Sequence, residues 1–448
     1  MNSTNLSQQE QQAVTESTAE QPPVQRRLPS HSLSDLLIPL SGAIDLAEGR
    51  DPGHAQRVAH IALSLSGSLG LASSDRLACA YAALFHDLGV VAAGAQLAGL
   101  TLGDERLVFA SIPPLAPEEA ALGIASSSPS LVADRITDHV VLGARAAQDL
   151  TLPEAAISAI SAHHERWDGG GYPDGLSGEE IPLAGRIVAI ADEVESLISQ
   201  EQSPLLARRN LPSWLTRFSG SHADPAIVNS MRDLASGDLF WLGLYGADLP
   251  AGLAAQCSRL KEPKAARVLG IAESFGQLVD SRFSFTQGVS GRIATIVEAL
   301  GRSAGLPEIR LKQLNAAVLL HDIGQLCVSE RIIAKPGILT VEELDVLRQH
   351  PVYSRDIVAG ITGFEEVAEW VAAHHERPDG RGYPDGLKGD EVPLEARILA
   401  VADAYVAITS DRPHRAKADR SDGVRMLRRA AGSQLDAELV ELFVSSVA

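Results

Sequence analysis

The sequence contains few cysteines and no long apolar segment. Its three cysteines are scattered, at positions 79, 257 and 327, which argues against a disulfide framework or a cysteine-based zinc site. No apolar run reaches the length of a bilayer-spanning helix, and the polar stretch at residues 1–31 has no signal-peptide core. We therefore expect a cytoplasmic protein with a disordered N-terminal tail at residues 1–31 and no membrane partner.

Aromatic residues and positive charge are also scarce. Aromatic residues make up 4 % of the chain and hydrophobic residues 45 %, so the cores must be built from Ala, Leu, Ile and Val. The net charge of −19 at pH 7 disfavours binding to polymeric nucleic acid or to an anionic membrane. A phosphate-bearing ligand would need local positive charge, from metal ions or from a few Arg and Lys residues.

What the chain does contain is an internal repeat. The stretch HHERWDGGGYPDGL begins at His163, and HHERPDGRGYPDGL begins at His374, an offset of 211 (374 minus 163). Upstream, ALFHDLG and VLLHDIG match at a larger offset, 235 (321 minus 86). The first copy therefore carries an insertion of about 24 residues (235 minus 211), which lies within the segment of about residues 91–138, between Gly89 and His139.

The hydrophobic pattern is helical in both copies. The stretch SSDRLACAYAALFHDLG places five apolar side chains on one helical face, and no stretch shows sustained strand alternation. We predict an all-α fold of two tandem helical bundles, with a first domain at 32–236, a connector at 237–262 and a second domain at 263–448. The five apolar side chains are Leu77, Tyr81, Leu84, Phe85 and Leu88.

The first copy combines five histidines with two carboxylates, and we expect these side chains at or near helix ends. Imidazole and carboxylate are ligands for iron, manganese, zinc and similar divalent ions. An adjacent His-Asp pair can supply one terminal and one bridging ligand, and two metals roughly 3.5–4 Å apart can clamp a phosphoryl oxygen. A single His-Asp or His-His pair is more often a structural hydrogen-bonded pair, but the ordered, duplicated set predicts a polynuclear metal site. Its residues are His54, His86, Asp87, His139, His163, His164 and Asp192.

The second copy keeps all but one of these positions. When the copies are aligned on their His-Asp motifs, Val289 stands where the first copy has His54, and valine has no lone pair to offer a metal. The second site is therefore expected to bind fewer ions, to bind them weakly, or to be empty. Its remaining candidate ligands are His321, Asp322, His350, His374, His375 and Asp403.

The order His…His-Asp…His…His-His…Asp, together with HHExxDGxGYP, resembles the HD-GYP family, a subset of the HD phosphohydrolases. The stretches KPGILTVEEL and RILAVADAYVAITSDRPHR strengthen the resemblance, which covers nearly the whole chain after the tail, twice. It implies a bi- or trinuclear iron or manganese centre and hydrolysis of cyclic di-GMP by a metal-bound hydroxide. It also implies that His86 and Asp87 are catalytic and that Asp87 bridges the metals.

The same resemblance implies where the substrate binds. The glycine-rich loop with Asp168, Gly171 and Tyr172, and Tyr383 in the second copy, would border the substrate pocket. This loop is also a candidate surface for the binding of diguanylate cyclase domains. A homodimer is a further candidate assembly. The stretch DRPHR would supply two arginines for phosphate, Arg412 and Arg415.

The chain departs from the family pattern at the lysine of the His-Asp motif. The family motif runs His-Asp-x-Gly-Lys, and its lysine faces the substrate phosphate, whereas this chain has Val90 and Gln325 at those positions. The leading hypothesis is a phosphodiesterase for cyclic di-GMP, catalytic in the first copy, with a structural or regulatory second copy. The alternatives are a degenerate signalling module that binds a nucleotide or a protein, and a phosphohydrolase on another nucleotide such as cyclic GMP-AMP.

Overall fold

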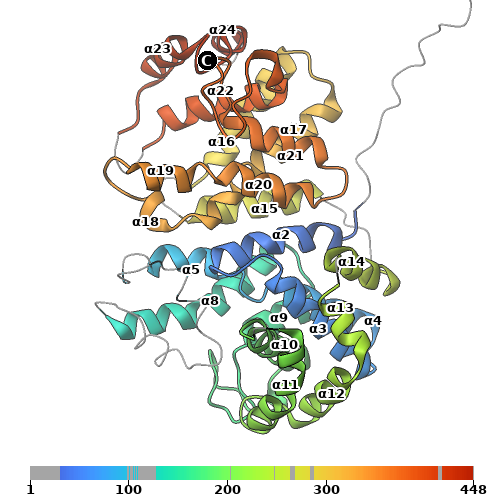
Figure 1. The fold of residues 1–448 in the computed structure, drawn as a ribbon. Helices are drawn as coiled ribbons and strands as arrows, with labels where there is room; N and C mark the ends of the chain where they lie inside the picture. The colour runs from blue at the N-terminus through green and yellow to red at the C-terminus, as the bar shows by residue number, and fades with distance from the viewer. Residues whose placement is uncertain are drawn as a thin grey trace, which may run out of the picture.

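The structure, a computed structural model, is helical throughout the residues that it describes, with no β-strand among them (Figure 1). Those residues are 31–97, 100, 104, 106, 108, 128–201, 203–246, 248–262, 268–282, 287–411 and 416–446. The predicted tail therefore lies almost wholly outside the described residues, as do Arg412, Arg415 and most of the predicted insertion. Within the described part of the chain, no helix is both long and apolar enough to cross a bilayer.

The first copy folds as a bundle around α3, α4, α8, α9 and α10, which pack against one another. The predicted apolar face of α4 and the turn after it is confirmed, because all five of its side chains are at most 7 % exposed. The elements are α2 (Ser34–Ala47), α3 (His54–Ser68), α4 (Ser73–Leu84), α5 (Val90–Leu97), α8 (Pro129–Asp149), α9 (Glu154–Ala162), η1 (Gly178–Glu180), α10 (Leu183–Ser199), α11 (Pro204–Phe218) and α12 (Pro225–Ser236).

The predicted connector is itself helical and packs on the first bundle. It forms α13 (Asp238–Leu244) and α14 (Leu249–Arg259), which lie against α3, and α14 also lies against α2. At its end, the Glu262 carboxylate accepts hydrogen bonds from the Ser34 backbone N–H at 2.7 Å and from the Tyr81 hydroxyl at 2.5 Å. These contacts attach residues 237–262 to the first half of the molecule.

The second copy repeats the bundle with α16, α17, α20, α21 and α22 at its centre. The repeat is therefore structural as well as sequential. The elements are α15 (Val268–Ser281), α16 (Val289–Ser303), α17 (Glu308–Leu320), η2 (Ile323–Cys327), α18 (Glu330–Ile333), α19 (Val341–Leu347), α20 (His350–Ala359), α21 (Glu365–Ala372), η3 (Ala373–His375), η4 (Gly389–Glu391), α22 (Leu394–Ile408), α23 (Arg420–Ala430) and α24 (Ala437–Ser446).

The two bundles meet through their first helices, α2 and α15, in a reciprocal way (Figure 1). Helix α2 packs on η2 and α20 of the second half, and α15 packs on α5 and α8 of the first. Pro39 of α2 lies beside Gly360, while Ser274 of α15 donates a hydrogen bond to the Asp149 carbonyl oxygen at 3.1 Å. In the alignment of the two copies Ser274 is the equivalent of Pro39, and Gly360 is the equivalent of Asp149. Equivalent positions therefore make equivalent contacts, as in a two-fold interface.

Candidate metal centre

The histidines and carboxylates predicted in the first copy come from five helical segments and meet at one point. His54 begins α3, His86 and Asp87 follow α4, and the pair His163-His164 follows α9. His139 and Asp192 lie inside α8 and α10, so the expectation of helix ends is wrong for these two. They project inward because each helix turns one face toward the bundle core, where both side chains are buried.

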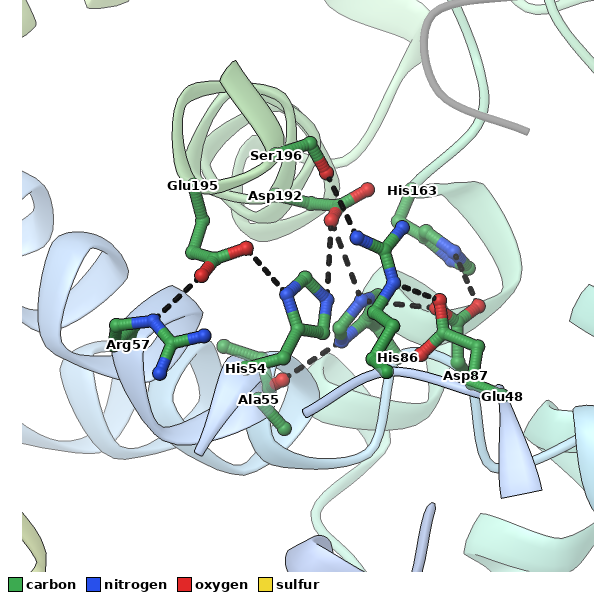
Figure 2. Close-up of polar contacts among 12 residues, drawn as sticks. Glu48, His54, Ala55, Arg57, His86, Asp87, His163, Asp192, Glu195 and Ser196 are labelled. Atoms are coloured by element: carbon green, nitrogen blue, oxygen red, sulfur yellow. Dashed lines mark hydrogen bonds and ion pairs between the residues drawn. The ribbon is translucent and has the colours of Figure 1, made fainter. Parts of the chain in front are cut away.

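Asp87 lies beside His86 and His163 (Figure 2). Its Oδ2 is 3.1 Å from His86 Nε2, and its Oδ1 is 3.3 Å from His139 Nε2 and 3.6 Å from His163 Nε2. One set of ligand atoms, within 4.8 Å of one another, comes from His54, His86 and Asp87. A second set, equally compact, comes from Asp87, His139, His163 and His164. The two sets share Asp87, which is the geometry of a bridging carboxylate between two metal positions.

Asp192 adds a second carboxylate on one side of the cluster. Its Oδ1 is 3.4 Å from His54 Nε2 and 3.7 Å from His86 Nε2. This oxygen, and the Nε2 atoms of His54, His86 and His163, are buried without a hydrogen-bond partner among the described residues. Buried polar atoms are rarely left unsatisfied, and these converge with the nitrogen and oxygen chemistry that divalent transition metals prefer. The residues present therefore fit the predicted metal ions.

Backbone carbonyls orient most of the histidine rings. In each case Nδ1 lies within hydrogen-bond distance of the carbonyl oxygen three residues earlier, which leaves Nε2 facing the cluster. The pairs are His86 with Ala83 at 2.8 Å, His139 with Ile136, His163 with Ile160 at 2.7 Å, His321 with Val318 at 2.6 Å, His350 with Leu347 at 2.7 Å and His374 with Val371 at 2.5 Å.

His54 is oriented instead by Glu195, a residue that the sequence analysis missed. Glu195 Oε2 lies 2.5 Å from His54 Nδ1, and its Oε1 accepts a hydrogen bond from Arg57 Nε at 2.6 Å (Figure 2). The same oxygen accepts a hydrogen bond from Ser199 Oγ at 2.6 Å. Glu195 is 1 % exposed. Its position one helical turn after Asp192 is the signal that could have identified it, because residues three apart share a helix face.

The pKa values of the cluster show carboxylates held in their charged form. Burial would raise the pKa of Asp87, but the neighbouring charge of His86 and hydrogen bonds from His139 outweigh it, so the pKa lies well below its ordinary value. Burial would likewise lower the pKa of His54, but Glu195 and Asp192 raise it to about 10. Burial, followed by the charge of His163, lowers the pKa of His164 well below its ordinary value. The centre therefore offers anionic oxygen atoms and a neutral imidazole to a cation.

The glycine of the His-Asp-x-Gly motif permits close packing of the cluster. A Cβ atom on Gly89 would lie 1.8 Å from the carbonyl oxygen of His139, and one on Gly324 would lie 2.1 Å from that of His350. Only glycine lets the segment after the His-Asp pair approach the backbone of the helix that carries the next histidine.

The glycine-rich loop lies against the cluster. The Tyr172 ring stacks on the His164 ring, with the ring centroids 4.8 Å apart. The Glu165 carboxylate accepts hydrogen bonds from the backbone N–H groups of Asp174 at 2.7 Å and Leu176 at 2.9 Å. In the second copy the Tyr383 ring stacks on His375 in the same way, at 4.8 Å.

Two other residues predicted to bind substrate have internal contacts in this loop. The Asp168 carboxylate accepts hydrogen bonds from Arg166 Nη2 at 2.6 Å and from the Gly170 backbone N–H at 2.9 Å. A Cβ on Gly171 would lie 2.3 Å from the Arg166 backbone nitrogen, so this glycine allows the loop to fold back on itself.

The second copy brings together a smaller set. His321, Asp322 and His374 form one compact group, and His350, His374 and His375 form another. Asp403 borders a cavity of 140 Å³ together with His321, Asp322 and His375. The Asp322 side chain is 31 % exposed, against 10 % for Asp87, so this centre is the more open of the two.

The second copy lacks both the histidine and the glutamate that orients it in the first copy. Val289 replaces His54, and Val406, in the register of the two HHE motifs, replaces Glu195. Both valines are buried. An apolar pair has therefore replaced a buried imidazole–carboxylate pair, an exchange that costs little when both partners change together.

Comparison with known proteins agrees with this architecture. Residues 127–215 and 273–439, together more than half of the chain, match the HD domain family. A 3′3′-cGAMP-specific phosphodiesterase of Vibrio cholerae is 28 % identical over 439 residues, covering 91 % of this chain and 92 % of its own. A cyclic di-GMP phosphodiesterase of Thermotoga maritima is 32 % identical over 176 residues, covering 39 % of this chain and 48 % of its own.

A solved structure superimposes on this chain over nearly its full length. The crystal structure of a cyclic GMP-AMP specific phosphodiesterase of V. cholerae superimposes with a TM-score of 0.65 at 26 % identity, covering 93 % of this chain and 98 % of that one. The repeated His-Asp motifs, the clusters that they form and these matches together show that the chain belongs to the HD domain family.

Proposed function

We propose that this protein is a metal-dependent phosphodiesterase that hydrolyses a cyclic dinucleotide in its first half. The observation that carries the proposal is the pair of ligand sets that share Asp87. Two divalent ions held in this way supply a Lewis acid for phosphoryl oxygens and lower the pKa of water to near neutrality.

The protein's own groups would position and neutralise the ions. His54, His86 and Asp192 would hold one ion, His139, His163 and His164 would hold the other, and Asp87 would bridge them. The backbone carbonyls and Glu195 would keep the imidazole rings in the tautomer that leaves Nε2 available. Burial of the cluster favours ion binding, because carboxylates and cations attract more strongly where water is excluded.

The substrate that we place first is 3′3′-cyclic GMP-AMP. The relative that matches along nearly the whole of both chains is specific for this nucleotide, whereas the cyclic di-GMP phosphodiesterase matches over 176 residues. Cyclic di-GMP, the substrate expected from the sequence motifs, remains the direct comparison in the assay. Iron and manganese are the metals that we propose for the centre.

The second half supports a different role, that of a binding or structural module. The replacement of His54 and Glu195 by Val289 and Val406 removes one metal ligand and the residue that would orient it. We propose that this half contributes little to hydrolysis, although its more open centre leaves room for a ligand.

The test is a comparison of two matched double variants. Protein purified without oxygen is analysed for iron and manganese and incubated with each cyclic dinucleotide, and the linear products are separated chromatographically. His86→Ala with Asp87→Ala should abolish hydrolysis and lower the metal content, since it removes the bridging ligand. His321→Ala with Asp322→Ala, the same change in the second copy, should leave most of the hydrolysis. Equal losses, or a loss only in the second variant, would contradict the division of roles.

A further inference from the structure

Arg50 lies between a surface cleft and the carboxylates of the first metal centre, and among the predicted ligands the cleft itself is lined by His54. Arg50 belongs to the segment between α2 and α3, and it lines this cleft of 730 Å³ together with His54, Glu195 and Tyr245. Arg50 and Arg57 are the two Arg or Lys residues among the described residues that line this cleft. Arg57 Nε donates a hydrogen bond at 2.6 Å to Glu195, the residue that orients His54, whereas Arg50 makes no hydrogen bond with Glu195 in the described part of the chain and lies nearer to the ligand carboxylates.

The Arg50 side chain reaches inward from the cleft toward the metal ligands. Its Nε donates a hydrogen bond to Glu48 Oε1 and its Nη1 donates to Ser196 Oγ at 3.3 Å, and the side chain is 13 % exposed. Burial would lower the pKa of Arg50, but the charges of Glu48, Asp192 and Asp87 outweigh it and raise the pKa. The guanidinium is therefore within electrostatic reach of the ligand carboxylates while it faces the cleft.

The position of the family's lysine, the last residue of the His-Asp-x-Gly-Lys motif, holds no cation in the first copy. Val90 follows Gly89 in the His-Asp-x-Gly motif and is 1 % exposed, so this position offers an apolar side chain buried in the bundle. In the alignment of the two His-Asp motifs, the second copy has Phe285 where the first has Arg50. The second copy therefore has no arginine at this position. The arginine that lines its cavity is Arg282, three residues earlier, and its guanidinium is bound to Glu330.

We propose that Arg50 binds the phosphodiester of the substrate at the mouth of the first centre. The inference rests on the proposed function and names a residue that acts in it. A guanidinium presents a planar set of N–H donors that matches two phosphate oxygens at once. In the free protein the Arg50 guanidinium donates a hydrogen bond to Glu48. When the nucleotide binds, a phosphodiester oxygen competes with Glu48 for the N–H donors of Arg50.

The first test is removal and partial restoration of the charge in the full-length, metal-loaded protein. Arg50→Ala should lower kcat/KM for 3′3′-cGAMP by about ten- to a hundredfold, the value of a charge-assisted hydrogen bond, mostly through a higher KM. Arg50→Lys should recover part of the loss, because it keeps the charge without the planar donor pair. The matched control is Arg208→Ala: Arg208 donates to Asp238 Oδ1 at 2.6 Å away from the cleft, and its loss should change neither constant.

The second test separates phosphate binding from a structural role of the Glu48–Arg50 pair. Glu48→Gln keeps an acceptor for Arg50 but makes a weaker hydrogen bond for a phosphodiester oxygen to displace, so it should lower KM or leave it unchanged. If the pair acts only as a structural link, Glu48→Gln will raise KM as Arg50→Ala does. The metal content of Arg50→Ala should equal that of the unaltered protein, and a loss of metal would overturn the proposal.

A binding measurement keeps the inference separate from the proposed function. If the unaltered protein does not hydrolyse either cyclic dinucleotide, the proposed function fails. The role of Arg50 is then decided by equilibrium binding of a phosphorothioate analogue of 3′3′-cGAMP to the metal-loaded protein. Binding that weakens in Arg50→Ala, but not in Arg208→Ala, supports the assignment, and equal or no binding in all three proteins overturns it.

Discussion

Glu195 provides the sharpest test of how this protein holds its first metal centre. In Glu195→Val, His54 stays buried at 1 % exposure and loses the partner of its Nδ1 atom. Breaking a buried pair by removing one partner costs about 3–5 kcal/mol. Asp192 still lies 3.4 Å from His54 Nε2, and the 24 %-exposed Arg57 side chain can be hydrated. We therefore expect the lower end of this range, about 3 kcal/mol.

The second copy of the repeat shows what the double variant should do. His54→Val with Glu195→Val reproduces the apolar pair Val289 and Val406, so neither member of the imidazole–carboxylate pair is left buried without the other. His54→Val alone leaves Glu195 bound to Arg57 and Ser199, so its cost should be about 1–2 kcal/mol. The double variant should be more stable than the sum of the single changes predicts, by about 2 kcal/mol, a coupling typical of residues in direct contact.

Hydrogen exchange followed by mass spectrometry measures this cycle on the metal-free chain. Peptides from α3 and α10 report the opening free energy of the first bundle, and peptides from α16 and α22 serve as an internal control that should not change. Metal affinity gives a second readout, since Glu195→Val should weaken it by about ten- to a hundredfold. Strictly additive free energies, or a Glu195→Val protein as stable as the unaltered one, would refute the role assigned to this pair.

Two further predictions concern the same centre. Gly89→Ala should lower the free energy of unfolding by about 2 kcal/mol or more, because its Cβ would lie 1.8 Å from the His139 carbonyl oxygen. Gly94→Ala in α5 has nothing within 4 Å of the added atom and should be neutral or stabilising by up to about 1 kcal/mol, so equal effects in chemical denaturation would contradict the packing argument. Metal binding should release protons at pH 7 and strengthen as pH rises, because the pKa of His54 is about 10 and that of His86 lies well above its ordinary value in the metal-free protein. Calorimetry in two buffers of different ionisation enthalpy measures this release, and no release would show that the two imidazoles are already neutral.

The sequence predicted the all-α fold, the duplication and the residues that meet at the first centre. These features are readable because they depend on local or repeated patterns. The buried face of α4 follows from helical spacing, and the ligand set follows from the same residue types recurring in the same order. The sequence also showed which copy is incomplete, because Val289 has no metal-binding atom.

The residues that orient and surround the metal ligands could not be predicted from local or repeated sequence patterns. Glu195 and His54 are 141 residues apart and meet only because α3 and α10 pack together. Arg50 lies near the cluster because residues 48–53, which follow α2, pass close to the metal ligands. The sequence does not distinguish such a segment from an ordinary surface loop.

The arrangement of the two copies likewise depended on the tertiary structure. The repeat predicts two similar bundles, but it contains no information about which faces meet. The contacts of Pro39 with Gly360 and of Ser274 with Asp149 join residues that are distant in sequence, and they form because α2 and α15 each pack on helices of the other bundle. Local spacing therefore determined what each copy is made of, and burial between distant segments decided how the ligands are held and how the copies are joined.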